Sequence, residues 1–203
     1  MENINIKNVN EFESQNADQL TSAVLKAMFS NQENNEVLID FLNTVLPQNR
    51  RVKNLARVTM KYAEVTPEDP NVMMGLQCED EDGRTFVVEL RKSCQDPFFK
   101  QCTWYVLQEY QRRASFGKFD NKIPAVVLIE ILGDDDLDRS HPTWEHRYIS
   151  KYSLREVVTN EPLNDSIQMI FVELKRFNKT WEACQTAQDK WCCILKNIIQ
   201  QEI

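Results

Sequence analysis

Twenty residues near the middle of the chain, 73–92, predict a β-hairpin with an unusual set of side chains. The segment MMGLQCEDEDGRTFVVELRK holds two apolar runs separated by an acidic turn that Gly83 closes. The second run ends in Glu89-Leu90-Arg91, which puts a carboxylate and a cation two residues apart. Side chains at i and i+2 of a strand lie on the same face. We therefore expect Glu89 and Arg91 to project together from a strand end, beside a partner strand that offers only Gly75.

The order of elements around this hairpin indicates an α/β fold. Helices and a strand precede it, and a helix and further strands follow, judged by apolar residues at helical or alternating spacing. Three strands followed by a helix and a buried strand predict a mixed central sheet flanked by helices, with an αβββαβ core. The expected helices cover residues 18–29, 32–46, 97–116 and 180–199, and the expected strands cover residues 55–62, 72–78, 85–91, 125–132, 147–154 and 167–177.

Composition limits the classes of protein that the chain fits. It has 203 residues, of which we expect 1–16 to be a frayed polar segment and 17–203 to form one domain. The four glycines lie too far apart to form a phosphate-binding loop, so no nucleotide cofactor is expected. The formal net charge of −7 argues against tight non-specific binding of nucleic acid.

The ends and the cysteines of the chain point to a cytoplasmic protein. The N-terminus has no apolar signal core, and no apolar window reaches the length of a membrane span, so no membrane partner is expected. The six cysteines form no C-x-x-C pair and are expected to be reduced thiols. Several fall on apolar faces, where cysteine packs as a small hydrophobic residue.

Several polar clusters have both a functional and a simpler interpretation. The acidic runs 79–82 and 134–136 could bind a metal or a protein, but a solvated surface is the simpler interpretation. His141 and His146 have no carboxylate or cysteine at a convincing ligand spacing, so a metal role is not favoured.

Two further groups of residues leave a surface role open. A helical stripe with Trp181 and Trp191 is most simply core, and if partly exposed it would be a homodimer face. Basic residues could line a DNA track if they share one face, although a solvated surface is somewhat favoured. They are Arg50, Arg51, Lys53, Arg57, Lys61, Arg112, Arg113, Lys118 and Lys122.

Taken in order, several segments resemble the PD-(D/E)XK nuclease family transposases, which are related to the recombination-promoting Rpn nucleases. The similarity covers most of the chain, from about Leu25 to Trp191. Each segment is a weak match alone, whereas the ordered set is fairly specific. The segments are residues 25–29, 33–35, 38–43, the acidic turn 78–84, the strand 87–90, the pair 104–105, residues 117–119, Pro124 with the apolar run after it, and residues 171–174.

The resemblance implies a metal-dependent DNA endonuclease with a restriction-endonuclease-like fold. In such sites an aspartate and a glutamate hold one or two Mg²⁺ ions, and a Lys or Gln two residues after the glutamate positions or activates water. Glu89 matches the glutamate, but Arg91 stands at the Lys or Gln position and Gly75 at the aspartate position. Gln101 stands where the family has an arginine before the aromatic pair. Because arginine stays charged and cannot act as a base, these departures predict a degenerate nuclease.

Two functions therefore remain open. The first is an endonuclease-derived protein in which Glu89 is the remaining metal ligand, Arg91 lies beside it, and DNA is contacted by Gln101, Arg112, Arg113 and Lys118. The second is a catalytically inactive module that uses the same fold to bind DNA, to bind a partner protein or to dimerise. A second carboxylate within reach of Glu89 would favour the first, and the candidates for it are Glu64, Asp69 and Asp80.

Overall fold

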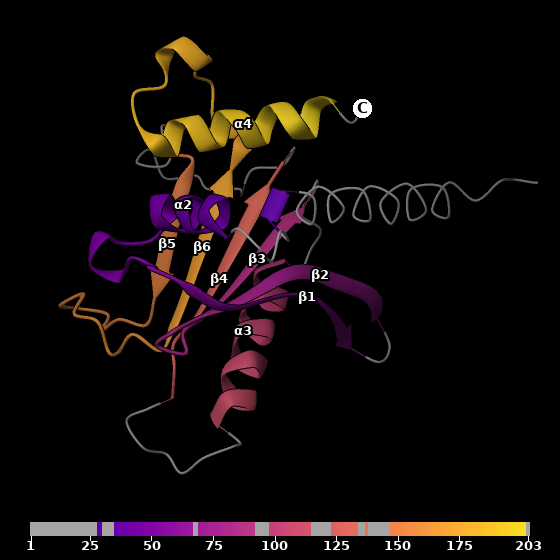
Figure 1. The fold of residues 1–203 in the computed structure, drawn as a ribbon. Coiled ribbons are helices and arrows are strands. Elements are labelled where there is room, and N and C mark those ends of the chain that lie inside the picture. Colours follow the sequence, from indigo (N-terminus) through magenta and orange to yellow (C-terminus); the bar gives the residue numbers. More distant parts are fainter. Residues whose placement is uncertain are drawn as a thin grey trace, which may run out of the picture.

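The computed structural model describes residues 28–29, 35–66, 69–91, 98–114, 123–133, 137 and 147–201. Its centre is a six-stranded sheet with the strand order β1-β2-β3-β4-β6-β5 (Figure 1). β3, β4 and β6 are parallel to one another, and the other strands pair antiparallel with their neighbours, so the predicted mixed sheet is confirmed. The strands are β1 (Leu55–Thr66), β2 (Asp69–Asp80), β3 (Thr85–Arg91), β4 (Val126–Leu132), β5 (Ile149–Ser153) and β6 (Ile167–Glu173).

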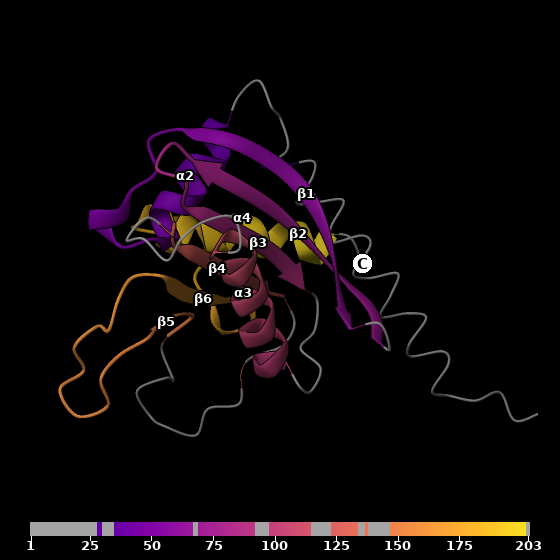
Figure 2. The ribbon, with the colours of Figure 1, turned by 90° about the horizontal axis from the view of Figure 1, so that it is seen from below.

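Helices cover both faces of this sheet. α2 (Glu36–Val45) and α4 (Ala187–Gln201) lie on one face, and α3 (Phe98–Ala114) crosses the other, as Figures 1 and 2 show from two directions. Alternate strand residues separate into two clusters, because successive side chains of a strand point to opposite faces. Leu76, Val88 and Ile129 pack on the side of α2 and α4, whereas Val87 and Leu128 pack under α3.

The predicted hairpin forms, with longer strands than its apolar runs suggest. β2 pairs with β3 only from Gly75 to Glu79, so residues 69–74 of β2 pair with β1 alone. In the acidic turn, the backbone N–H groups of Asp82 and Arg84 donate to Asp80 Oδ1 over 3.1 and 2.9 Å. Gly83 takes a φ of 77°, which a residue without a side chain adopts at little cost.

The C-terminal helix begins later than predicted. Trp181–Ala183 form a short 3₁₀ turn, η4, and α4 starts only at Ala187, whereas a continuous helix from residue 180 was expected. The reason is a local cap, in which Asp189 N–H donates to Thr186 Oγ1 over 3.0 Å and Thr186 N–H donates to Asp189 Oδ2 over 3.2 Å. This reciprocal pair fixes the first turn at Thr186.

Smaller differences occur at other element ends. β6 stops at Glu173 and continues as the 3₁₀ turn η3 (Leu174–Arg176), so the strand expected to reach residue 177 is too long. A further 3₁₀ turn, η1 (Gln48–Arg50), follows α2. Cysteines 78, 102, 184, 192 and 193 are buried, as their apolar positions predict.

Several predictions fall outside the described residues. They are the frayed segment 1–16, most of the helix at 18–29, the acidic run 134–136, and His141 and His146; of the first helix only residues 28–29 are described, and they are helical. Among the helices that are described, none combines the length and the apolar character that a membrane crossing requires.

Candidate functional site

Strand register places Gly75, Glu89 and Glu130 in one row across three neighbouring strands. Gly75 of β2 is paired with Glu89 of β3, and Glu89 is paired with Glu130 of β4. Directly paired residues project from the same face of a sheet, and this row lies on the face that α3 covers. Glu89 is 2% exposed and Glu130 is fully buried, so two carboxyl groups stand side by side beneath the helix.

The guanidinium of Arg91 connects the two carboxyl groups. Arg91 Nη2 lies 3.0 Å from Glu89 Oε2, and Arg91 Nε lies 3.2 Å from Glu130 Oε2. Arg91 is the last residue of β3, and its side chain is 20% exposed. The predicted common face of Glu89 and Arg91 is therefore present, and the cation is held between two acids rather than beside one.

Side chains from α3 close the site from above. Cys102 Sγ donates to Glu130 Oε1 over 3.5 Å, and the face of the Phe98 ring packs on the Arg91 guanidinium, with 5.7 Å between the guanidinium carbon and the ring centroid. Burial, followed by the nearby charge of Glu130, raises the pKa of Cys102, so it stays a thiol. Burial, with Glu89 as the next cause, also raises the pKa of Tyr105. Next to the two acids, the helix thus contributes a neutral thiol and a neutral phenol.

The charges in this site do not balance if both acids are ionised. Burial, and then the charge of Glu130, raises the pKa of Glu89 to about 8, although Arg91 opposes this shift. For Arg91, burial acts to lower the pKa, but the charges of Glu130 and Glu89 outweigh it and raise the pKa. One guanidinium therefore stays charged, and near neutral pH Glu89 holds its proton more tightly than an exposed carboxyl group does.

Gly75 lies in direct contact with Glu89. A Cβ atom added at Gly75 would lie 2.9 Å from Glu89 Cγ and 3.1 Å from Glu89 Oε1, closer than normal packing allows. The Glu89 side chain therefore occupies part of the space that a side chain at position 75 would fill. Glu89 Oε1 is buried and has no hydrogen-bond partner among the described residues, so one acceptor of the site is unused.

The side chains as arranged do not fit the divalent metal that the resemblance implies. Two carboxylates are suitable ligands for a hard cation, but a permanent positive charge already lies between them, and position 75 offers no oxygen. Nor do the described residues bring three or more His, Cys, Asp or Glu side chains together in a group that could hold a metal ion.

Of the three residues considered as substitutes for the missing aspartate, Asp80 does not join the site. Asp80 lies on β2 among residues of the opposite parity to Gly75, and its carboxylate accepts hydrogen bonds from Arg84 Nε and from the turn. Its role is to hold the hairpin turn. The side chains of Glu64 and Asp69 lie outside what the structure describes.

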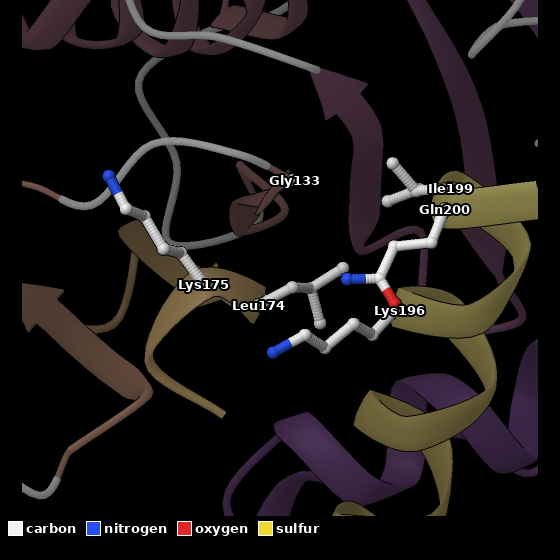
Figure 3. Close-up of a pocket in the computed structure, with 6 residues that line it drawn as sticks. All are labelled: Gly133, Leu174, Lys175, Lys196, Ile199 and Gln200. Carbon is white, nitrogen blue, oxygen red and sulfur yellow. The ribbon is translucent and has the colours of Figure 1, made fainter. Parts of the chain in front are cut away.

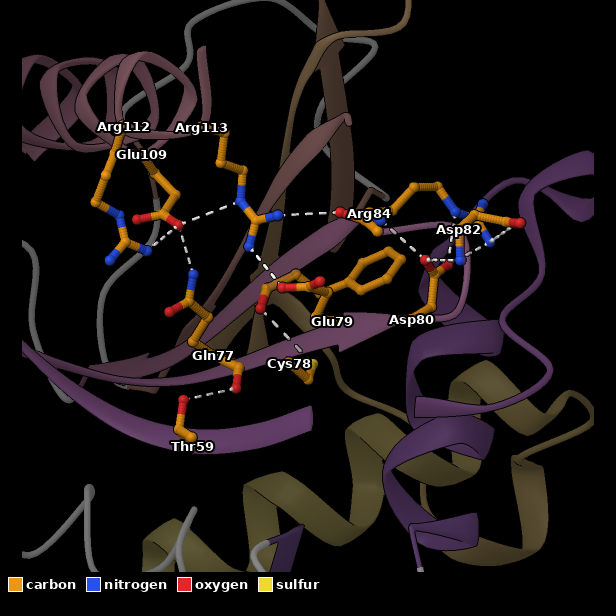
Figure 4. Close-up of polar contacts among 12 residues, drawn as sticks. Thr59, Gln77, Cys78, Glu79, Asp80, Asp82, Arg84, Glu109, Arg112 and Arg113 are labelled. Carbon is orange, nitrogen blue, oxygen red and sulfur yellow. Dashed lines mark hydrogen bonds and ion pairs between the residues drawn. The ribbon is translucent and has the colours of Figure 1, made fainter. Parts of the chain in front are cut away.

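Of the residues predicted to contact DNA, two belong to an ion-pair network between α3 and β2 (Figure 4). Arg113 Nη2 lies 3.0 Å from Glu79 Oε2, and Arg113 Nη1 donates to the Gly83 carbonyl. Arg112 Nη2 lies 2.6 Å from Glu109 Oε1, which also accepts from Gln77. Arg113 is 16% exposed and Arg112 is 53% exposed, so Arg112 is the more accessible cation.

The structure says less about Gln101 and Lys118, the other two residues predicted to contact DNA. Gln101 precedes Cys102 on α3 and is partly exposed, and Lys118 lies outside the described residues. A DNA contact through any of the four residues stays a prediction.

A pocket of about 240 Å³ lies at the carboxyl end of the parallel strands, on the other face of the sheet (Figure 3). Leu174 and Ile199, which line it, belong to the apolar cluster under α2 and α4. Lys196 Nζ donates to the Phe177 carbonyl over 2.6 Å. The remaining lining residues are Gly133, Lys175, Lys196 and Gln200. The sheet separates this pocket from Glu89, so it is not part of the acidic site.

Glu130 is the site residue that sequence reasoning missed. It stands within the run AVVLIEIL, which was interpreted only as a buried apolar strand. A fully buried glutamate is rare unless it is paired, so a single acid in such a run is itself a signal of a buried partner.

Comparison with known proteins agrees with this fold. A family model described as PD-(D/E)XK nuclease family transposase matches residues 20–203. No curated protein and no solved structure matches the chain. Nucleases of the PD-(D/E)XK type generally use divalent metals. The family match spans nearly the whole chain, and the chain therefore belongs to the PD-(D/E)XK nuclease family transposases.

Proposed function

We propose that this protein is a family member that binds DNA without cleaving it. The observation that carries the absence of cleavage is the position of Arg91 between Glu89 and Glu130, at 3.0 and 3.2 Å. Metal-dependent hydrolysis requires a Lewis-acidic cation that coordinates water and lowers its pKa. A guanidinium has only N–H donors and cannot coordinate water as a metal ion does, so it cannot generate hydroxide.

Accessible basic residues near the C-terminal end of α3 support the binding role. Arg57 of β1 is exposed and is paired in register with Glu79, which contacts Arg113. Arg57 therefore lies on the sheet face that carries α3, together with the half-exposed Arg112. Cations gathered on one face are what a phosphate backbone requires. Since the whole chain is acidic, we expect this binding to be local and to weaken steeply with salt.

Cleavage and metal binding are tested first, on the native chain. We expect plasmid DNA to remain intact with Mg²⁺ or Mn²⁺, and calorimetry to detect no specific binding of either ion. As a comparison, the Gly75→Asp/Arg91→Lys variant restores the residue types that the family resemblance implies. Metal-dependent cleavage by the native chain, abolished by Glu89→Ala, would overturn the non-cleaving proposal.

DNA binding is tested by fluorescence anisotropy with a labelled duplex at several salt concentrations. We expect Arg57→Ala/Arg112→Ala to weaken binding by about tenfold, the effect of roughly 1.4 kcal/mol. Lys175→Ala/Lys190→Ala removes two exposed cations away from α3 and is the matched control. Equal loss in both variants would mean that only the overall charge matters, and absence of native binding would favour a protein partner instead.

A further inference from the structure

We propose that this chain associates with a second copy of itself, through the loop 154–166 of one copy and the pocket beside α4 of the other. The loop connects β5 to β6 and has an apolar tip. The pocket is lined by buried apolar residues and by two lysines. The inference goes beyond the proposed function, because neither surface includes the acidic site or the cations to which we assign DNA contact.

The tip of the loop is formed by Val157 and Val158, which are 95% and 88% exposed. Leu163, on the returning side of the same loop, is 73% exposed. A single exposed apolar side chain is ordinary on a protein surface, whereas several on one short loop mark a surface that another molecule covers. The described part of the chain leaves the two valines almost entirely uncovered.

The loop holds its conformation through its own hydrogen bonds. Glu156 Oε2 accepts from the backbone N–H groups of Val158, over 2.8 Å, and of Thr159. Arg155 Nη1 donates to the Asn160 carbonyl over 2.7 Å. Asn160 has a φ of 59°, a conformation that asparagine adopts more readily than most residues. The tip is therefore shaped before it meets a partner, which lowers the cost of ordering it on association.

The pocket has the size and the lining that such a tip requires. Leu174 and Ile199, which line it, are buried and apolar. Figure 3 shows Lys175 coming from η3, and Lys196 and Gln200 from α4. Pockets for drug-sized ligands have volumes of about 300–1,000 Å³. This one, of about 240 Å³, is therefore suited to one or two side chains.

The two surfaces carry opposite charges. Glu156 and Glu161 flank the two valines in the sequence, and both are exposed. The charged residues that line the pocket are Lys175 and Lys196. Lys196 Nζ already donates to the Phe177 carbonyl, but an ammonium group has more than one N–H donor. Opposite charges around an apolar centre favour the encounter of these two surfaces over the encounter of like ones.

The loop cannot fill the pocket of its own chain. It ends where β6 begins, and Leu174 follows the last residue of β6. The seven residues of this strand separate the two surfaces by about 23 Å. A second copy placed antiparallel to the first brings its loop to this pocket and offers its own pocket in return. The contact is then made twice, which closes the pair as a dimer.

The test is analytical ultracentrifugation of the full chain from low micromolar to millimolar concentration. We expect the native chain to form a dimer, and the loop variant, Val157→Ser/Val158→Ser, to associate at least about tenfold more weakly. The pocket variant, Lys175→Glu/Gln200→Glu, should lose association to a similar extent. Trp181→Ser is the matched control, because it removes an exposed apolar side chain outside both surfaces, and it should associate as the native chain does.

An equal mixture of the two variants, one of them labelled, distinguishes this contact from a contact between two loops. The loop variant keeps its pocket and the pocket variant keeps its loop, so the mixture should associate more strongly than either variant alone. Because every substituted side chain is exposed, we expect melting temperatures close to that of the native chain.

Four results would overturn the inference. They are a native chain that remains a single copy, a pocket variant that associates as the native chain does, a mixture without recovery, and a loss of association in Trp181→Ser. DNA binding is measured at lower protein concentrations, where the chain is a single copy, so it reports on the proposed function separately.

Discussion

The two faces of the central sheet are built from alternate residues of the same strands, yet they differ in what they bury. On the side of α2 and α4, Leu76, Val88 and Ile129 form a continuous apolar row. On the side of α3, the neighbouring row holds Gly75, Glu89 and Glu130. In each of these strands, therefore, two successive residues lie on opposite faces, one in the apolar row and the other in the row that holds the two acids. The apolar face, together with the apolar residues that surround the acids under α3, holds the carboxyl pair away from water.

The largest expected effect comes from breaking the apolar face. Ile129 is fully buried, and Ile129→Ala leaves a cavity under α2 and α4, so we expect a loss of about 4 kcal/mol in the free energy of unfolding. Glu130→Gln, one residue further on, keeps the shape of the side chain and should cost less than about 2 kcal/mol, because Glu89 still pairs with Arg91. Urea unfolding at pH 7 measures both. Equal losses would mean that the two faces contribute alike.

The next effect comes from removing the cation of the α3 face. Arg91→Met leaves two buried acids without their partner, and we expect a loss of about 3 kcal/mol at pH 8. The loss should shrink towards pH 5, because the raised pKa of Glu89 leaves that acid protonated there. Arg91→Lys, which keeps the charge but not the fork of donors, should lie between the variant and the native chain. A pH-independent loss in Arg91→Met would assign the effect to packing on Phe98 instead.

The same two faces explain what the sequence could and could not predict. Alternation and the turn at Gly83 were enough to place β2 and β3 and to put Glu89 and Arg91 on one face. Glu130 was missed because β4 is covered on both sides, so its apolar pattern has no period that separates one face from the other. The late start of α4 was missed because Trp181 and Cys184 also fall at helical spacing, which hid the cap made by Thr186 and Asp189.

The dependence of stability on pH distinguishes the two faces without disturbing their packing. Glu89 has an ordinary pKa of 4.5, and its pKa in the fold is about 8, so the folded chain binds this proton more tightly than the unfolded chain. The stability that this proton contributes is full below the ordinary pKa and is lost as the pH rises through about 8. We expect the native chain to lose more than about 1 kcal/mol between pH 5 and pH 8, the equivalent of one pKa unit.

Glu89→Gln removes this titrating group and should flatten the pH profile. Urea unfolding at four values of pH between 5 and 8 gives both profiles, with Ile129→Ala as a control that shifts the profile without changing its slope. A native profile that rises over this interval would contradict the raised pKa of Glu89.

The smallest effect tests whether the absence of a side chain at position 75 matters. In Gly75→Ala, the new Cβ would lie 2.9 Å from Glu89 Cγ and 3.2 Å from Val87 Cγ1, so Glu89 must move while Arg91 holds its carboxylate. We expect a loss of about 1 kcal/mol. The loss should become smaller in a Glu89→Ala background, since the two closest atoms are then absent and only the contact with Val87 remains.

A matched glycine on the other face sharpens this last comparison. In Gly133→Ala the new Cβ would lie 3.3 Å from Ile199 Cγ2, on the side of α4. Its cost should be nearly the same with and without Glu89, because its nearest atom belongs to Ile199 and its contact with Arg91 is to the backbone carbonyl, not to the guanidinium that pairs with Glu89. A double-mutant cycle by urea unfolding measures both couplings. Coupling to Glu89 at position 75 and none at position 133 would show that the glycine of β2 makes room for the acid. Equal couplings would mean that Glu89 acts through the whole sheet rather than through the space above Gly75.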